Sequence, residues 1–160
     1  MSADLVLTPS ERDVLTQSRR AILATISPDG RPRLVPICFV LDPDRPILHS
    51  PLDEKPKDID DVRRLARVRD VIRDPRVTVL VDTWDENWSQ LGWLRCDGTA
   101  SLLEPSSDDA GEHRAAVAAL RSKYPQYATH DLASRPMIHV LLERATSWSA
   151  STRGHPDPSA

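Results

Sequence analysis

One short segment of the sequence combines side chains that suit an anionic ligand. Ser50, Lys55 and Lys57 lie in a stretch that also contains Pro51 and Pro56, so this stretch cannot be a regular helix or strand. It follows a strand-like pattern and precedes a helical one. The amino end of a helix offers free N–H groups and a positive dipole, which together attract phosphate. We therefore consider this loop a candidate phosphate site, while an exposed charged loop without a ligand explains the same residues equally well.

Lysine is rare in this chain, which adds weight to that loop. The sequence has 3 lysines against 18 arginines, and two of the three lysines fall in this one segment.

Tryptophans form a second group. Trp84, Trp88 and Trp93 lie close together in a chain with only 4% aromatic residues. Core packing explains Trp93, which follows a strand pattern. Trp84 and Trp88 are in a polar loop and are difficult to bury within one small domain. They suit a flat partner, either a protein surface or a planar ring.

Other kinds of site have less support. The five histidines do not fall at metal-ligand spacing with a second ligand, so no metal site is predicted. The sequence contains no GxSxG motif, glycine-rich dinucleotide fingerprint or P-loop. A Cys38–His139 thiolate pair is conceivable, but isolated cysteines are usually core residues. Six arginines between Arg63 and Arg76 alternate with aspartates, which is typical of a solvated helix face. The net charge of −3 also argues against nucleic-acid binding.

Hydrophobic spacing and turn residues predict the elements that would position these side chains. The sequence Thr8–Glu11 predicts a capping box that opens a helix ending near Ser18. Ser27–Gly30 predicts a hairpin turn, with Gly30 in a left-handed conformation. Further helices are expected at 58–74 and 112–124, and strands at 20–27, 33–41, 47–49, 77–81, 91–103 (bent at Gly98) and 137–148.

Consecutive hairpins without a βαβ unit indicate a mainly β fold with inserted helices, built as an antiparallel barrel. A length of 160 residues fits one domain, which we assign to residues 1–149. Residues 150–160 carry no large apolar side chain, so we expect a disordered tail. We also expect a cytoplasmic location, because the amino terminus lacks signal-peptide features and two separate cysteines suit a reducing compartment.

Four stretches together resemble the flavin and deazaflavin split-barrel family related to pyridoxamine 5′-phosphate oxidase. Within it, the chain is similar to the actinobacterial branch assigned to coenzyme F420. The resemblance covers nearly the whole chain, and one departure is Asp70, where relatives often carry asparagine. The stretches are Ala24–Phe39, Lys55–Val77, Trp88–Arg95 and Lys123–Tyr127.

The resemblance implies a six-stranded antiparallel split β-barrel, known as the FMN-binding split barrel, that forms a homodimer with cofactors at the interface. Ser50, Lys55 and Lys57 would lie near the phosphate and ribityl groups. The ring would be lined by Pro36, Ile37 and Cys38, and approached by Trp88 and Trp93 of the partner subunit. The implied activity is hydride transfer between F420 and an unidentified organic substrate. It assigns no catalytic side chain, and we expect neither a nucleic-acid nor a membrane partner.

Three alternatives remain open at this point. The chain could be an FMN-binding oxidase or flavin reductase on the same fold. It could bind a deazaflavin, haem or bilin without catalysis. It could also be a dimeric interaction protein without a cofactor.

Overall fold

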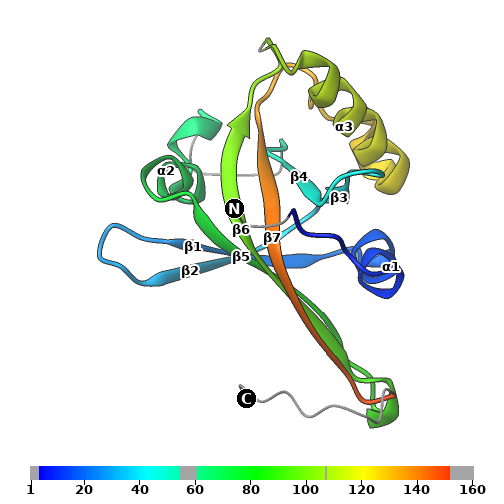
Figure 1. Ribbon diagram of the computed structural model, residues 1–160. Coiled ribbons are helices and arrows are strands. Elements are labelled where there is room, and N and C mark those ends of the chain that lie inside the picture. Colours follow the sequence, from blue (N-terminus) through cyan, green and yellow to red (C-terminus); the bar gives the residue numbers. More distant parts are fainter. Residues whose placement is uncertain (1–3, 55–60, 107, 152–160) are drawn as a thin grey trace.

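The fold is a single curled antiparallel sheet with three α-helices around it (Figure 1). The computed structural model describes residues 4–54, 61–106 and 108–151. The sheet order is β2-β1-β5-β6-β7-β4-β3. The strands are β1 (Ala21–Ile26), β2 (Pro32–Ile37), β3 (Val40–Leu41), β4 (Ile47–Pro51), β5 (Arg76–Thr83), β6 (Gly92–Leu103) and β7 (Met137–Ser149). The helices are α1 (Pro9–Gln17), α2 (Ala66–Arg73) and α3 (Ala110–Lys123), with short 3₁₀ turns η1 (Val62–Arg64), η2 (Trp88–Gln90) and η3 (Pro125–Thr129).

The two edge strands of the sheet, β2 and β3, follow each other in the chain. Only Cys38 and Phe39 separate them, so the sheet must curl until the end of β2 lies near β3. The two strands do not pair within the described chain, so the barrel is incomplete. The predicted mainly β antiparallel fold is therefore confirmed. The strand count differs, because the expected single strand 33–41 is two strands, giving seven instead of six.

Side chains explain this break. At Cys38 and Phe39 the backbone pairs with side chains in place of a neighbouring strand. The Ser50 hydroxyl donates to the Cys38 carbonyl at 2.9 Å, and the Phe39 N–H donates to the Tyr124 hydroxyl oxygen at 3.1 Å. Buried backbone groups must find a partner, and here Tyr124, which directly follows α3, and Ser50 of β4 supply it.

The core has two parts. One fills the barrel between the sheet and helices α1 and α2, with Leu15, Leu23 and Phe39 fully buried. The other lies between α3 and the neighbouring strands, around Leu120 and Met137. Both parts use the inward-facing residues of alternating strand patterns, as the sequence predicts.

Several local predictions are confirmed. Thr8 and Glu11 form the capping box of α1, and Gly30 has a φ of 82° in the β1–β2 turn. β6 shifts register at Gly98, where a Cβ atom would lie 2.3 Å from the Leu141 carbonyl oxygen. The glycine therefore permits the close approach of β7 and the bend of the long β6–β7 ribbon.

The predicted helix 58–74 is wrong in extent. Residues 58–60 lie outside the described residues, and the described part is η1 followed by α2. Leu65 separates the two with an extended ψ of 138°, and the Asp61 side chain caps η1 by accepting from the Arg63 N–H. The expected tail lies outside the described residues from 152 onward. Among the described helices, none has the length and apolar character needed to cross a membrane.

Candidate functional site

The end of β2 and the end of β4 lie together and form the centre of the candidate site. Pro36 is exposed, Ile37 is buried and Cys38 is half-buried, and Ser50 bonds to the Cys38 carbonyl as described above. Four of the predicted cofactor-binding residues are therefore neighbours. Because β2 is at the edge of the sheet, its outer backbone groups have no neighbouring strand within the described chain. Such groups can bond to the polar edge of a planar heterocycle.

The predicted phosphate ligands Lys55 and Lys57 lie outside the described residues. The segment that leads to them leaves β4 beside Ser50. Its first residues, Leu52 and Asp53, are buried, so the segment begins from a fixed position.

A polar cluster from the carboxyl end of α3 and from η3 lies against Cys38 and Phe39. The Tyr127 hydroxyl donates to Asp53 Oδ2 at 2.6 Å, and both residues are buried. The Lys123 ammonium lies 4.1 Å from the centre of the Phe39 ring. From the sequence, Lys123 and Tyr127 were placed in the fourth family-like stretch without a role.

Burial sets the charge states in this cluster. It lowers the pKa of Lys123 to about 8, with a further contribution from the nearby Arg19 cation. It also raises the pKa of Tyr127, as do its hydrogen bonds to Asp53 and Cys38. At neutral pH Tyr127 therefore keeps its hydroxyl proton and donates it in the hydrogen bond to Asp53, and Lys123 is a cation that loses its proton more readily than an exposed lysine.

The predicted tryptophans lie far from Ser50 and Cys38 in the structure. Trp88 is in η2 and Trp93 is the second residue of β6, at the end of the arm formed by β5, β6 and β7. By contrast, β4 lies beside α3 at the other end of the molecule (Figure 1). Trp84 and Trp88 are 70% and 69% exposed. One chain therefore does not bring the tryptophans to Ser50 and Cys38.

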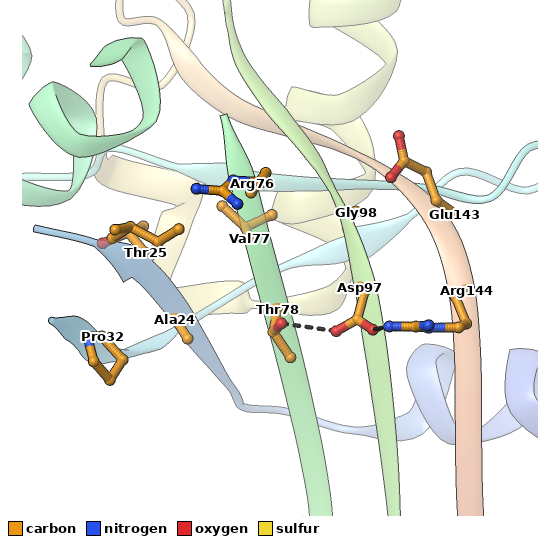
Figure 2. A pocket seen from close by; sticks show the side chains of 11 residues that line it. Ala24, Thr25, Pro32, Arg76, Val77, Thr78, Asp97, Gly98, Glu143 and Arg144 are labelled. Carbon is orange, nitrogen blue, oxygen red and sulfur yellow. Dashed lines mark hydrogen bonds and ion pairs between the residues drawn. The ribbon is translucent and has the colours of Figure 1, made fainter. Parts of the chain in front are cut away.

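The outer face of the sheet carries a pocket of about 400 Å³ that the sequence did not predict. Strands β1, β2, β5, β6 and β7 contribute to it (Figure 2). The Thr78 hydroxyl donates to Asp97 at 2.8 Å, and Arg144 Nε donates to the same carboxylate at 3.0 Å. Leu34 is 63% exposed and is the register partner of Ala24, which lines the pocket. The pocket is therefore on an outward face with exposed apolar surface.

Asp70 has a structural role that its sequence position did not reveal. Its side chain is 1% exposed and accepts a hydrogen bond from Thr25 Oγ1 at 2.9 Å. Arg33 and Arg73 approach the same carboxylate at 3.0 and 3.2 Å. Asp70 is thus a buried carboxylate that links α2 to β1 and β2.

A third polar group lies under the amino end of α3. His49 Nε2 and His139 Nε2 are 2.7 and 3.4 Å from Glu112 Oε1. Burial lowers the pKa of His49, against the opposing effect of Glu112. Burial raises the pKa of Glu112, but hydrogen bonds from His49 and Arg45 outweigh it and lower that pKa overall. The Cys38–His139 pair considered from the sequence is not supported, since His139 faces Glu112 and the Cys38 side chain bonds to Tyr127. Local spacing could not reveal the histidine group because its members come from three separate elements.

Solved structures with the same fold cover most of the chain. A conserved hypothetical protein, Rv2991 from Mycobacterium tuberculosis, has a TM-score of 0.68 and 21% identity, covering 99% of this chain and 98% of its own. An FAD-binding protein from Mesorhizobium loti has a TM-score of 0.62 and 20% identity, covering 88% and 94%. An F420 reductase has a TM-score of 0.60 and 19% identity, covering 88% and 98%. At these identities the likeness concerns the fold.

The family assignment has a separate basis in the sequence. The profile of the pyridoxamine 5′-phosphate oxidase family matches residues 7–149, which include every described strand. The chain therefore belongs to the pyridoxamine 5′-phosphate oxidase family, with the split-barrel fold of that family.

Proposed function

We propose that this protein binds coenzyme F420 and transfers a hydride between it and an organic substrate. The observation that carries the proposal is the family match over residues 7–149. The arrangement at the end of β2 supports it, because the open edge of β2 lies beside Ser50, and β4, which carries Ser50, leads into the segment of Lys55 and Lys57. The resemblance of the four sequence stretches favours a deazaflavin over FMN. The solved F420 reductase has the same fold.

The residues present fit such a group in two respects. The outer edge of β2 offers backbone donors and acceptors for the ring, and the two lysines offer positive charge for a phosphate. The cofactor supplies the hydride chemistry when bound, and the protein supplies position and electrostatics. In this proposal Ser50 fixes the Cys38 carbonyl, so the backbone that faces the ring keeps one geometry. The hydrogen-bonded pair of Tyr127 and Asp53 supports this backbone from behind.

The proposal includes a homodimer that pairs through the outer face of the sheet. Leu34, Trp84 and Trp88 are each more than half exposed, and none of the described elements of one chain covers them. In such a dimer Trp88 and Trp93 of one subunit would approach the cofactor of the other. The pocket of Figure 2 would then become part of the interface.

An FMN-dependent oxidase or flavin reductase is the second candidate. The specific observation in its favour is the FAD-binding protein with the same fold and a similar TM-score. Competing titrations decide between the two candidates. We expect F420 to bind more tightly than FMN to the purified full-length protein. Tighter binding of FMN would replace the proposal with the flavin alternative, and binding of neither would favour a protein without such a cofactor.

A double variant tests the phosphate site. Lys55→Ala with Lys57→Ala should weaken F420 binding at least about tenfold, since charge-assisted contacts each contribute ~1.5–3 kcal/mol. The loss should shrink at high salt because the charges are screened. The control removes two exposed positive charges from helices, Arg69→Ala with Arg114→Ala, and should bind as the wild type does. Equal binding by both double variants would place the phosphate elsewhere.

A further inference from the structure

Three side chains of metal-ligand type converge from three separate elements at the edge of the barrel. His49 is on β4, His139 is on β7 and Glu112 is in the first turn of α3. His49 and His139 are direct register partners, so both imidazoles are on the same face of the sheet, with ring centres 5.5 Å apart. Both Nε2 atoms point to the same carboxylate oxygen, Glu112 Oε1.

The separations of the three ligand atoms suit one metal ion. All three lie within 4.8 Å of one another. Ligand atoms bound to zinc at about 2.0–2.1 Å in a tetrahedron are roughly 3.3 Å apart. The His139–Glu112 distance of 3.4 Å already meets this requirement, and the His49–Glu112 pair at 2.7 Å needs to open slightly.

Arg45 holds the outer oxygen of the carboxylate, while the inner oxygen faces the two histidines. Arg45 Nη2 lies 3.2 Å from Glu112 Oε2 and 2.9 Å from Asp42 Oδ2. The arginine thus orients Glu112 from the outer oxygen, as outer partners of metal ligands commonly do. It also adds positive charge near the site, which Asp42 offsets.

The two histidines differ in exposure, and this defines the open side of the site. The His49 side chain is 3% exposed, whereas His139 and Glu112 are 21% and 16% exposed. A metal ion held by all three would keep a fourth position facing solvent, where water can bind. Two imidazoles and one carboxylate suit Zn²⁺ better than Mg²⁺ or Ca²⁺, which prefer oxygen ligands alone.

We propose that His49, Glu112 and His139 bind one divalent transition-metal ion, with Zn²⁺ best suited to the donors. The site is separate from the proposed cofactor site, since successive side chains of a strand point to opposite faces and Ser50 follows His49 on β4. The ion joins α3 to β4 and β7. It would fix the helix whose other end carries Lys123 and Tyr124.

Titration of Zn²⁺ into untagged, chelator-treated full-length protein tests the site. Calorimetry should show one site per chain at micromolar Zn²⁺, and Co²⁺ in its place should give the visible absorption of a tetrahedral site. Saturating Zn²⁺ should raise the melting temperature. His139→Gln and Glu112→Gln should each weaken binding by at least about tenfold, because loss of even an outer partner commonly costs 10–100-fold.

His130→Gln is the matched control, because it removes a histidine that is in neither the cluster nor its shell. It should bind Zn²⁺ as the wild type does. Circular dichroism confirms that each variant is folded, and Glu112→Gln keeps the shape of the side chain. The proposal is overturned by folded wild-type protein that binds no Zn²⁺ at micromolar concentration. Retained affinity in folded His139→Gln and Glu112→Gln overturns it equally.

Discussion

Replacement of Asp70 gives a test of how the barrel is held to α2. The carboxylate accepts from Thr25 and faces two arginines. A hydrogen bond to a charged group contributes about 1.5–3 kcal/mol, and each half-exposed ion pair contributes ~0.2–1 kcal/mol. Asp70→Ala removes all three interactions and leaves the buried Thr25 hydroxyl without its acceptor. We expect the free energy of unfolding to fall by about 2–5 kcal/mol.

Asp70→Asn should cost less, for a geometric reason. Thr25 and Arg33 both approach Oδ2, whereas Arg73 approaches Oδ1. An asparagine oxygen in the Oδ2 position keeps the first two contacts as weaker neutral-acceptor bonds. Its NH₂ group then faces Arg73, whose side chain is 40% exposed and can turn into water. We expect a loss of about 1–2 kcal/mol.

Urea unfolding of both variants measures these losses, with Asp82→Asn as the control. That substitution removes the same charge from an exposed position on β5 and should change stability by less than about 0.5 kcal/mol. A double-mutant cycle of Asp70→Ala with Thr25→Val isolates the hydrogen bond. A loss below about 1 kcal/mol for Asp70→Ala, or equal losses for alanine and asparagine, would refute the charge-centred account.

Three further predictions concern assembly, charge and backbone. Light scattering should give twice the 17.9 kDa chain mass, and a monomer mass at micromolar protein would contradict the proposed dimer. The pKa of Lys123 is lowered from 10.5 to about 8 in the folded protein. The free energy of unfolding should therefore increase as the pH rises between these two values. Lys123→Met should therefore stabilise the protein by about 1–2 kcal/mol at pH 7, after allowance for the partial exposure of the side chain, and should give no gain above pH 10.5. A gain that does not depend on pH would exclude the lowered pKa of Lys123 as its cause. Gly98→Ala should destabilise by at least about 2 kcal/mol because its Cβ meets the Leu141 backbone, whereas Gly111→Ala in α3 should be neutral or stabilising in the same melts.

Local sequence patterns predicted most of the elements because they depend on neighbouring residues. The capping box at Thr8, the left-handed Gly30 and the bend at Gly98 all follow from residue type and immediate context. The break between β2 and β3 does not. It depends on Ser50 and Tyr124, which reach Cys38 and Phe39 from distant parts of the chain.

The candidate site likewise combines residues that the sequence predicted with contacts that it could not predict. The sequence pointed to Ser50 and Cys38, and the structure joins them by a hydrogen bond. It could not predict that Tyr127 bonds to Asp53, since 74 positions separate them. The Glu112 group combines three elements, so only the β4–β7 register and the placement of α3 create it.

These long-range contacts share one physical consequence for the proposed function. α3 touches the barrel through Glu112 at its first turn and through Lys123 and Tyr124 at its end. Tyr124 satisfies the backbone at the very point where the sheet opens. A change at either end of α3 therefore bears on the position of the β2 edge, where the ring of the proposed cofactor would bind. We therefore expect Zn²⁺ at the Glu112 site to change the affinity for F420, and F420 to change the affinity for Zn²⁺ by the same factor.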